Sequence, residues 1–240
     1  MTTPYGDRME RVRRAMAGAG VDVLLLSVGP DLPWLVGYEA MPLERLTMLV
    51  VPRDGDATLV VPRLEAARVV DRGDLFRLHP WGETEDPIEI VGKLSGAPGA
   101  ASVGDRTWSG FLVDLQARMP SPTFGRASAV LGPLRSEKDP AEVDALRAAA
   151  AAADRVATRL RAGEIPLLGR TEAEVSAELG RQLLAEGHHR VNFAIVAAGE
   201  NAASPHHEAG DRRLVAAARE VQPEQMGRIE IGRASCRERV

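Results

Sequence analysis

The sequence has few aromatic residues and almost no cysteine. Aromatic side chains make up 4% of the 240 residues, and the single cysteine is Cys236. A core must therefore be built from Ala, Val and Leu, and no disulfide framework can form within the chain. Residues 1–14 contain no apolar signal core. These absences suit a reducing compartment, and we expect a cytoplasmic protein.

Long apolar runs and an excess of positive charge are also missing. No run approaches the roughly 18 residues that a membrane helix requires, and the formal net charge is -4. A nucleic-acid surface needs clustered Lys and Arg to contact phosphates. We therefore expect neither a membrane nor a nucleic acid as a partner. The 45% hydrophobic and 27% charged residues are ordinary for one large or two small globular domains.

The first part of the chain alternates between helical and strand patterns. Apolar residues recur at helical spacing over residues 8–19, with Asp7 as a candidate N-cap and Gly20 as a candidate C-cap. The turn at residues 53–56 predicts a hairpin between its two flanking strands. Further helices are predicted over 64–70, 86–94 and 109–118, and strands over 21–27, 46–52, 57–62, 75–79 and 101–104. The alternation predicts an α/β sandwich around a mixed sheet.

The pattern changes near Leu134, where we place a domain boundary. Asp139 opens a long Ala-rich helix over residues 141–161. Thr171 and Glu174 have the spacing of a capping box, which predicts a second helix reaching about residue 186. Beyond it, residues 192–198 are predicted as a strand and residues 215–220 as a helix.

An ordered set of motifs runs from about residue 7 to residue 214. Its first half comprises residues 8–11 with 20–22, the turn Trp34-Leu35-Val36-Gly37-Tyr38, and Arg45 before an apolar strand. Its second half comprises Leu134-Arg135-Ser136-Glu137-Lys138-Asp139-Pro140, then Gly169-Arg170-Thr171-Glu172-Ala173-Glu174-Val175, then Gly199-Glu200-Asn201-Ala202-Ala203-Ser204-Pro205-His206-His207. In this order and spacing, the motifs resemble the creatinase/prolidase (pita-bread) metallopeptidases, and among them the Xaa-Pro peptidases.

The resemblance implies a fold of the α/β class. Residues 1–134 would form a creatinase-type N-terminal domain, similar to ribonuclease H, and residues 135–214 would begin an incomplete α+β pita-bread catalytic domain. Residues 215–240 are expected to be an aberrant tail. Enzymes of this family use two divalent metal ions, commonly Mn²⁺ or Co²⁺, to hydrolyse peptides next to proline. In these enzymes the N-terminal domain packs over a neighbour's catalytic domain, which implies a homodimer.

His206 is the one residue to which we carry over a catalytic role from the resemblance. In resembling enzymes the His after Pro in this motif contacts substrate or moves protons, and imidazole suits that task because its pKa lies near operating pH. A surface-loop histidine is the alternative, and the Gly199-Glu200-Asn201 pattern before it favours the functional interpretation. His207 has weaker support, because the family often has another residue there.

The other titratable residues have structural interpretations. The pair His188-His189 invites a metal interpretation, but adjacent residues do not face one ligand. Just past a helix end, the pair would instead complement the negative end of the helix dipole. We expect a structural role for His79, a solvated loop for Glu83, Glu85 and Asp86, and a turn role for Asp54 and Asp56.

The metal ligands of the family find no match in this sequence. Asp211-Arg212-Arg213-Leu214 fits the segment before the first metal-binding Asp, but residues 215–226 depart from the pattern, and no Asp follows Asp211. We therefore expect this chain to hold no metal ion and to be an inactive fragment. Residues 230–240 resemble translated sequencing-adapter DNA, with a natural Arg-rich tail as the alternative.

Three functions stay open at this point. The first is a metal-dependent Xaa-Pro peptidase, of aminopeptidase P or prolidase type, acting on proline-containing peptides. The second is a creatinase-like amidinohydrolase. The third is a non-catalytic family member that acts as a binding or interaction protein, because a fold does not fix a function.

Overall fold

The computed structural model describes residues 4–216 and divides into two compact units between Lys138 and Asp139. Helix α5 (Ser128–Ser136) runs through the position near Leu134 where we predicted a boundary. The predicted tail from residue 217 onward, including the adapter-like segment and Cys236, lies outside the described residues.

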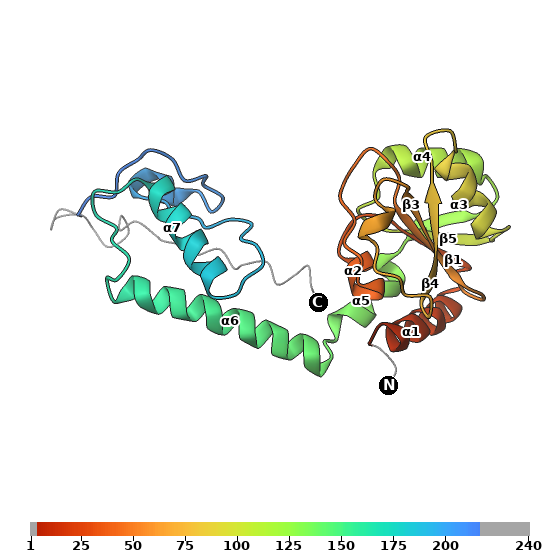
Figure 1. The fold of residues 1–240 in the computed structure, drawn as a ribbon, viewed down its shortest axis with the longest axis horizontal. Coiled ribbons are helices and arrows are strands. Elements are labelled where there is room, and N and C mark those ends of the chain that lie inside the picture. Colours follow the sequence, from red (N-terminus) through yellow and green to blue (C-terminus); the bar gives the residue numbers. More distant parts are fainter. Residues whose placement is uncertain (1–3, 217–240) are drawn as a thin grey trace. The chain divides into compact units, whose positions relative to one another are not determined.

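The first unit is built on a mixed sheet (Figure 1). Within residues 4–138 its six strands have the order β4-β3-β2-β1-β5-β6. Strand β2 is antiparallel to both of its neighbours, while β1–β5, β5–β6 and β3–β4 are parallel pairs. The strands are β1 (Val23–Leu26), β2 (Met48–Pro52), β3 (Ala57–Pro62), β4 (Phe76–Trp81), β5 (Ala100–Val103) and β6 (Thr123–Arg126). The predicted mixed sheet and the hairpin between β2 and β3 are confirmed.

Helices cover both faces of this sheet. Helices α1 (Pro4–Ala19), α2 (Asp31–Val36) and α5 share one core with Leu24 and Leu26, whereas α3 (Pro87–Ser95) and α4 (Ser109–Arg118) share another with Val23 and Leu25 (Figure 1). Successive side chains of a strand point to opposite faces, so β1 supplies both cores in turn. Its unbroken apolar run follows from burial on both sides. The predicted α/β sandwich is therefore confirmed.

The helix ends of the first unit include one unpredicted cap, one predicted cap that is confirmed and one that is wrong. Asp86 caps α3 by accepting from the N–H groups of Ile88 at 2.9 Å and Glu89 at 3.3 Å. Gly20 follows α1 with a φ of +66°, as a C-cap requires. The proposed cap at Asp7 is wrong, because α1 already begins at Pro4.

Three short elements of the first unit were not predicted, and one predicted helix is much shorter than expected. Helices α2 and α5 each contain a proline, and strand β6 is a mostly exposed edge strand, so none shows a clear apolar period. Residues 64–70 form only the short 3₁₀ helix η1 (Ala66–Arg68). Leu64 is 73% exposed, so this segment lacks the packed apolar face that stabilises most helices.

The second unit is described from Asp139 to residue 216 and contains two long helices. Helix α6 (Pro140–Arg161) and helix α7 (Glu172–Ala185) each begin with a complete capping box, formed by Asp139 with Glu142 and by Thr171 with Glu174. Their shared core contains Val156, Ile165, Val175, Leu179, Leu183, Val196 and Leu214. The prediction of both helices is confirmed.

Residues 192–198 do not form the strand that we predicted. Apart from a bridge at Val196 they are irregular, and their polar groups bond to side chains: Ser176 Oγ donates to the Ala194 carbonyl at 2.6 Å, and the Ala198 N–H donates to Glu172 at 2.7 Å. The short 3₁₀ helix η2 (Gly199–Ala203) follows. Of the predicted helix over 215–220, the described residues 215 and 216 are not helical.

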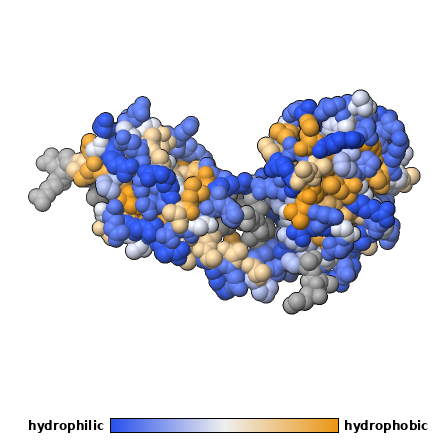
Figure 2. Space-filling view, in the orientation of Figure 1, coloured by the Kyte–Doolittle hydropathy of each residue, from blue (hydrophilic) through white to orange (hydrophobic). Residues whose placement is uncertain are grey.

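The surfaces of both units are largely hydrophilic in the view of Figure 2, with apolar residues interspersed. Large apolar side chains that lie exposed include Trp108 and Val113 in the first unit and Leu168, Leu184 and Phe193 in the second. None of the helices within residues 4–216 combines the length and apolar character that crossing a bilayer demands.

Replacing Leu25 should destabilise the first unit strongly. Leu25 is completely buried in the core under α3 and α4, so Leu25→Ala should lower the free energy of unfolding by about 2–5 kcal/mol. All three tryptophans, Trp34, Trp81 and Trp108, lie in this unit, so tryptophan fluorescence during urea unfolding reports on it alone. The same change at the exposed Leu64 should stay within about 0.5 kcal/mol of wild type. Equal effects of the two changes would contradict the proposed core.

Candidate functional site

The motif residues of the second unit meet at the carboxylate of Glu172. This side chain is completely buried at the first position of α7. Its Oε1 accepts from the Ala198 N–H at 2.7 Å and from Asn201 Nδ2 at 3.0 Å, and its Oε2 lies 2.7 Å from His207 Nε2 and 3.3 Å from the Gly210 N–H. We call Glu172, Asn201, His207 and the N–H groups of Ala198 and Gly210 the Glu172 cluster.

Backbone pairing brings the chain back to the start of α7. The N–H of Glu172 donates to the Arg212 carbonyl at 2.9 Å, and the N–H of Ala173 donates to the Gly210 carbonyl at 3.0 Å. Residues 169–170 and 214 exchange a further pair of backbone hydrogen bonds, at 2.8 Å each. These bonds satisfy N–H groups that a helix start leaves without intrahelical partners. They also fix the end of the segment 198–210 against the start of α7.

The cluster holds Glu172 in its ionised form. Burial by itself raises the pKa of this carboxyl, but the hydrogen bonds from His207, Asn201 and the N–H groups of Ala198 and Gly210 outweigh burial and lower the pKa from 4.5 to about 2. An ionised carboxylate only accepts hydrogen bonds, so Nε2 of His207 carries a proton in this contact. The position of Glu172 in the first turn of α7 also favours a negative charge.

The loop between Ala198 and Gly210 contains a tight turn in which His206 is exposed. The His207 N–H donates to the Ser204 carbonyl at 3.4 Å, which places Pro205 and His206 at the two corners of the turn. His206 is exposed, whereas the side chain of His207 is only 19% exposed. The two adjacent histidines therefore occupy different environments: His207 lies against Glu172, and His206 faces solvent at the corner.

Gly199 makes the beginning of this loop possible. Its φ is +57°, a conformation that L side chains rarely adopt, and a Cβ there would lie 2.6 Å from Arg212 Nη2. Arg212 in turn donates to Glu200 Oε1 at 2.6 Å. The glycine of the Gly199-Glu200-Asn201 motif thus allows the chain to turn tightly under an arginine side chain.

Sequence reasoning selected His206 and gave little weight to the residues that the structure joins most closely. Glu172, Asn201 and His207 were part of quoted motifs, but no role was assigned to the first two. The sequence did carry a signal for these residues, because the motif Thr-Glu-x-Glu is followed later in the chain by Asn and by His-His. What a sequence does not show is that residues 172 and 207 are 2.7 Å apart.

The other titratable residues singled out in the sequence lie in strands, turns and helix ends. The backbone N–H of His188 bonds to the Leu183 carbonyl just past α7, while Nε2 of its imidazole is buried without a hydrogen-bond partner among the described residues; His79 lies opposite Val60 in the β3–β4 pair. Residues 4–216 contain no group of three or more His, Cys, Asp or Glu side chains that could hold a metal ion. The predicted solvated loop of Glu83, Glu85 and Asp86 is confirmed, since residues 83–86 are exposed and irregular. Within it, Asp86 is the N-cap of α3, and Glu83 and Glu85 contact arginines. Asp54 and Asp56 likewise pair with Arg53 and Arg77.

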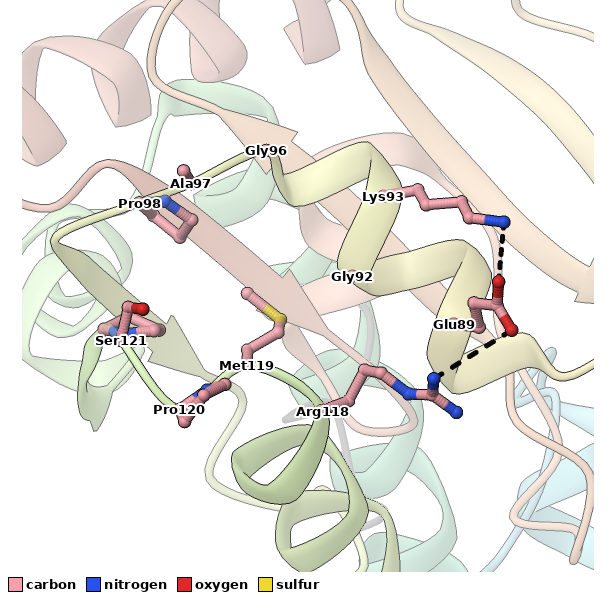
Figure 3. A pocket seen from close by; sticks show the side chains of 11 residues that line it. Glu89, Gly92, Lys93, Gly96, Ala97, Pro98, Arg118, Met119, Pro120 and Ser121 are labelled. Carbon is pink, nitrogen blue, oxygen red and sulfur yellow. Dashed lines mark ion pairs between the residues drawn. The ribbon is translucent and has the colours of Figure 1, made fainter.

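A groove of about 390 Å³ lies in the first unit between the ends of α3 and α4 (Figure 3). Lys93 Nζ lies 2.7 Å from Glu89 Oε1, and Arg118 Nη2 lies 2.7 Å from Asp86 Oδ2. The pKa of Glu89 is lowered, chiefly by its hydrogen bond with Lys93. Since the charges at this groove neutralise one another, the groove lacks the convergent reactive groups of a catalytic site.

Family profiles match both units. Residues 8–136 match the creatinase/prolidase N-terminal domain, and residues 144–232 match metallopeptidase family M24. The chain therefore belongs to the creatinase/prolidase family of metallopeptidases, and the predicted resemblance and fold class are confirmed.

Named relatives of the chain are peptidases. It is 39% identical over 215 residues to the probable dipeptidase PepE of Mycobacterium tuberculosis, an alignment that covers 88% of this chain and 56% of that protein. It is 26% identical over 214 residues to the uncharacterized peptidase SH1217 of Staphylococcus haemolyticus, covering 87% of this chain and 58% of that protein. The chain thus spans somewhat more than half the length of the curated relatives that it matches.

Solved structures of dipeptidases share the fold. The crystal structure of the dipeptidase PepE from Mycobacterium ulcerans has a TM-score of 0.79 and 39% identity, covering 88% of this chain and 57% of that one. A dipeptidase from Pyrococcus horikoshii has a TM-score of 0.76 and 30% identity, covering 87% and 58%. These likenesses show that the chain shares its fold with part of these dipeptidase structures.

Acid should destabilise the second unit through Glu172. Its pKa is about 2 in the folded chain against 4.5 ordinarily, so its contribution to stability is present above about pH 4.5 and is lost as the pH falls toward 2. The difference corresponds to about 3 kcal/mol. In urea unfolding followed by far-UV circular dichroism, Glu172→Gln should remove this part of the pH dependence.

Glu174→Gln is the matched control for that experiment. It removes the same charge from the same first turn, and glutamine can keep the capping bond that Glu174 Oε2 accepts from the Thr171 N–H at 2.8 Å. The Glu174→Gln chain should therefore retain most of the acid sensitivity of the wild type. Parallel pH profiles for wild type and Glu172→Gln would show that the buried carboxylate does not contribute.

Proposed function

We propose that the protein is a metal-dependent Xaa-Pro peptidase and, within that class, a dipeptidase. The observation that carries the proposal is the 39% identity with PepE over 88% of this chain, which includes the His206 motif. The substrate would be a short peptide with proline after the scissile bond. Membership of a metallopeptidase family supports a requirement for divalent metal ions in the intact enzyme.

The described part of the chain does not fit a metal pair. Within residues 4–216 the acidic and imidazole side chains form no ligand group, and the buried Glu172 is already surrounded by four donor groups. We propose that this part of the protein contributes substrate contacts and proton movement, and that the metal ligands come from other residues. We propose Mn²⁺ or Co²⁺ as the metals of the intact enzyme and no bound metal for the described residues.

His206 is the residue that we propose to act on the substrate. Its imidazole is exposed at the corner of a turn, and the neighbouring His207 is tethered to Glu172. A histidine in such a position can bind the substrate carbonyl or carboxylate and can move a proton near neutral pH. We also propose the domain limits 1–134 and 135–214, a cytoplasmic location and a homodimer for the intact enzyme.

The 240-residue chain should not cleave Xaa-Pro dipeptides, whereas the full-length product of its gene should. The reason is that the sequence does not match the family's metal ligands. The measurement is the release of proline in the presence of Mn²⁺ or Co²⁺, with an added chelator as the control. Cleavage by the purified 240-residue chain would overturn the proposal that this chain is an inactive fragment. Hydrolysis of creatine, or peptide binding without turnover by the full-length product, would instead support the amidinohydrolase or the non-catalytic alternative.

His206→Ala should lower kcat/KM of the full-length enzyme by about 10²–10⁴-fold, the usual contribution of a positioned acid or base. His189→Ala is the control, because His189 is exposed beyond the end of α7 and outside the Glu172 cluster. Steady-state kinetics on a dipeptide substrate would compare the two. An unchanged kcat/KM in His206→Ala would remove the assigned role.

A further inference from the structure

We propose that Glu172 is a positioning residue that fixes the loop of residues 198–210 and thereby sets the orientation of His206. The inference rests on the proposed function, because it concerns the residue to which catalysis is assigned. It extends that function by naming Glu172, Asn201 and His207 as the parts that hold the loop. Glu172 itself is buried and acts through these contacts.

The contacts are spread along the whole loop. The Ala198 N–H begins the loop, Asn201 lies in η2, His207 closes the turn, and the Gly210 N–H ends the loop; all four donate to one carboxylate, at 2.7–3.3 Å. Between these points, residues 203–206 are exposed and contribute no apolar core. Ala198 and Ala209 also pack against the core near the two ends of the loop. The stretch between them is held by polar contacts, and these converge on the side chain of Glu172.

The Glu172 side chain is not needed to begin α7. Thr171 Oγ1 accepts from the Glu174 N–H at 3.1 Å, and Glu174 Oε2 accepts from the Thr171 N–H at 2.8 Å, which completes the cap. The N–H of Glu172 itself bonds to the Arg212 carbonyl. With the helix start satisfied by other groups, the buried carboxylate serves the loop alone.

Tethering His207 limits the freedom of His206. His207 is held at its side chain by Glu172 and at its N–H by the Ser204 carbonyl. On the other side of His206, the ring of Pro205 fixes φ near -65°. With planar peptide bonds on both sides, His206 keeps little backbone freedom, and its imidazole is presented from one backbone geometry.

The negative charge of Glu172 explains why a carboxylate is suited to holding this loop. Hydrogen bonds to an ionised acceptor are shorter and roughly twice as strong as neutral ones, and the contacts to Ala198 and His207 measure 2.7 Å. A neutral amide at the same place would present N–H groups to a cluster made of donors. Misplacing a catalytic group by about 1 Å can cost roughly 10²-fold in rate, so the tether bears on catalysis.

The test uses Glu172→Gln, with Glu174→Gln as the matched control, in two arms. In the first arm, amide hydrogen exchange of the 240-residue chain should rise at least tenfold at Ala198 and Gly210 in Glu172→Gln and stay unchanged in Glu174→Gln. In the second arm, kcat of the full-length enzyme should fall more than tenfold in Glu172→Gln, while KM changes by less than about threefold.

His207 provides a second pair of variants that keeps the buried carboxylate. His207→Gln retains a side-chain N–H that can reach Glu172 and should restore most of kcat, whereas His207→Ala should lose it. If Glu172→Gln fails to fold, this pair and Glu172→Asp carry the test. Rescue by glutamine separates positioning from a direct role of the imidazole.

The outcomes are distinguishable. A full-length wild type that cleaves no Xaa-Pro substrate refutes the proposed function, and the exchange arm still decides whether Glu172 holds the loop. Native exchange at Ala198 and Gly210 in Glu172→Gln overturns the inference. So does a loosened loop with an unchanged kcat, because His206 would then act without the tether.

Discussion

A buried carboxylate must find donors, and the second unit is organised around that requirement. Transferring an ionised carboxyl from water into a protein interior is costly unless hydrogen bonds replace its hydration. Glu172 obtains them from residues 26–38 positions further along the chain. The loop can thus be irregular and largely exposed and still have one conformation, because its polar groups converge on one point rather than on a neighbouring strand.

The first unit satisfies its polar groups in a different way. Its backbone donors and acceptors pair within a six-stranded sheet, and two apolar cores cover the two faces. Val23 and Leu25 contact one core while Leu24 and Leu26 contact the other, so β1 is specified by burial alone. Asp22, directly before β1, accepts from the N–H groups of Gly99 and Ala100 at 2.8 Å and 3.0 Å. In the first unit, pairing between strands and burial on the two faces of the sheet are therefore sufficient to satisfy the polar groups and specify the fold.

This contrast explains what the sequence could predict. The helices at 109–118 and 141–161, the β2–β3 hairpin and the Thr171 capping box depend on periodicity and on residues within a few positions of each other. The contact between Glu172 and His207 spans 35 positions and depends on tertiary placement. Residues 192–198 were predicted as a strand because their apolar residues fit one, yet side chains of α7 supply the bonds that a neighbouring strand would have supplied. Resemblance to a family favoured a role for His206 over one for His207, and the geometry adds that the two side chains occupy different environments.

The same cluster limits where metal chemistry can arise. An ionised carboxylate has about four lone-pair sites, and the four donor groups around Glu172 occupy them. A cation would have to displace several of these donors and would leave them buried without partners, which costs free energy for each. His207 is engaged through Nε2 in the same cluster. Glu172 is therefore not available as a ligand, whereas the Nδ1 atom of His207 lies outside this contact. Glu172 thus holds the loop that carries His206, and any metal pair must use carboxylates other than this one.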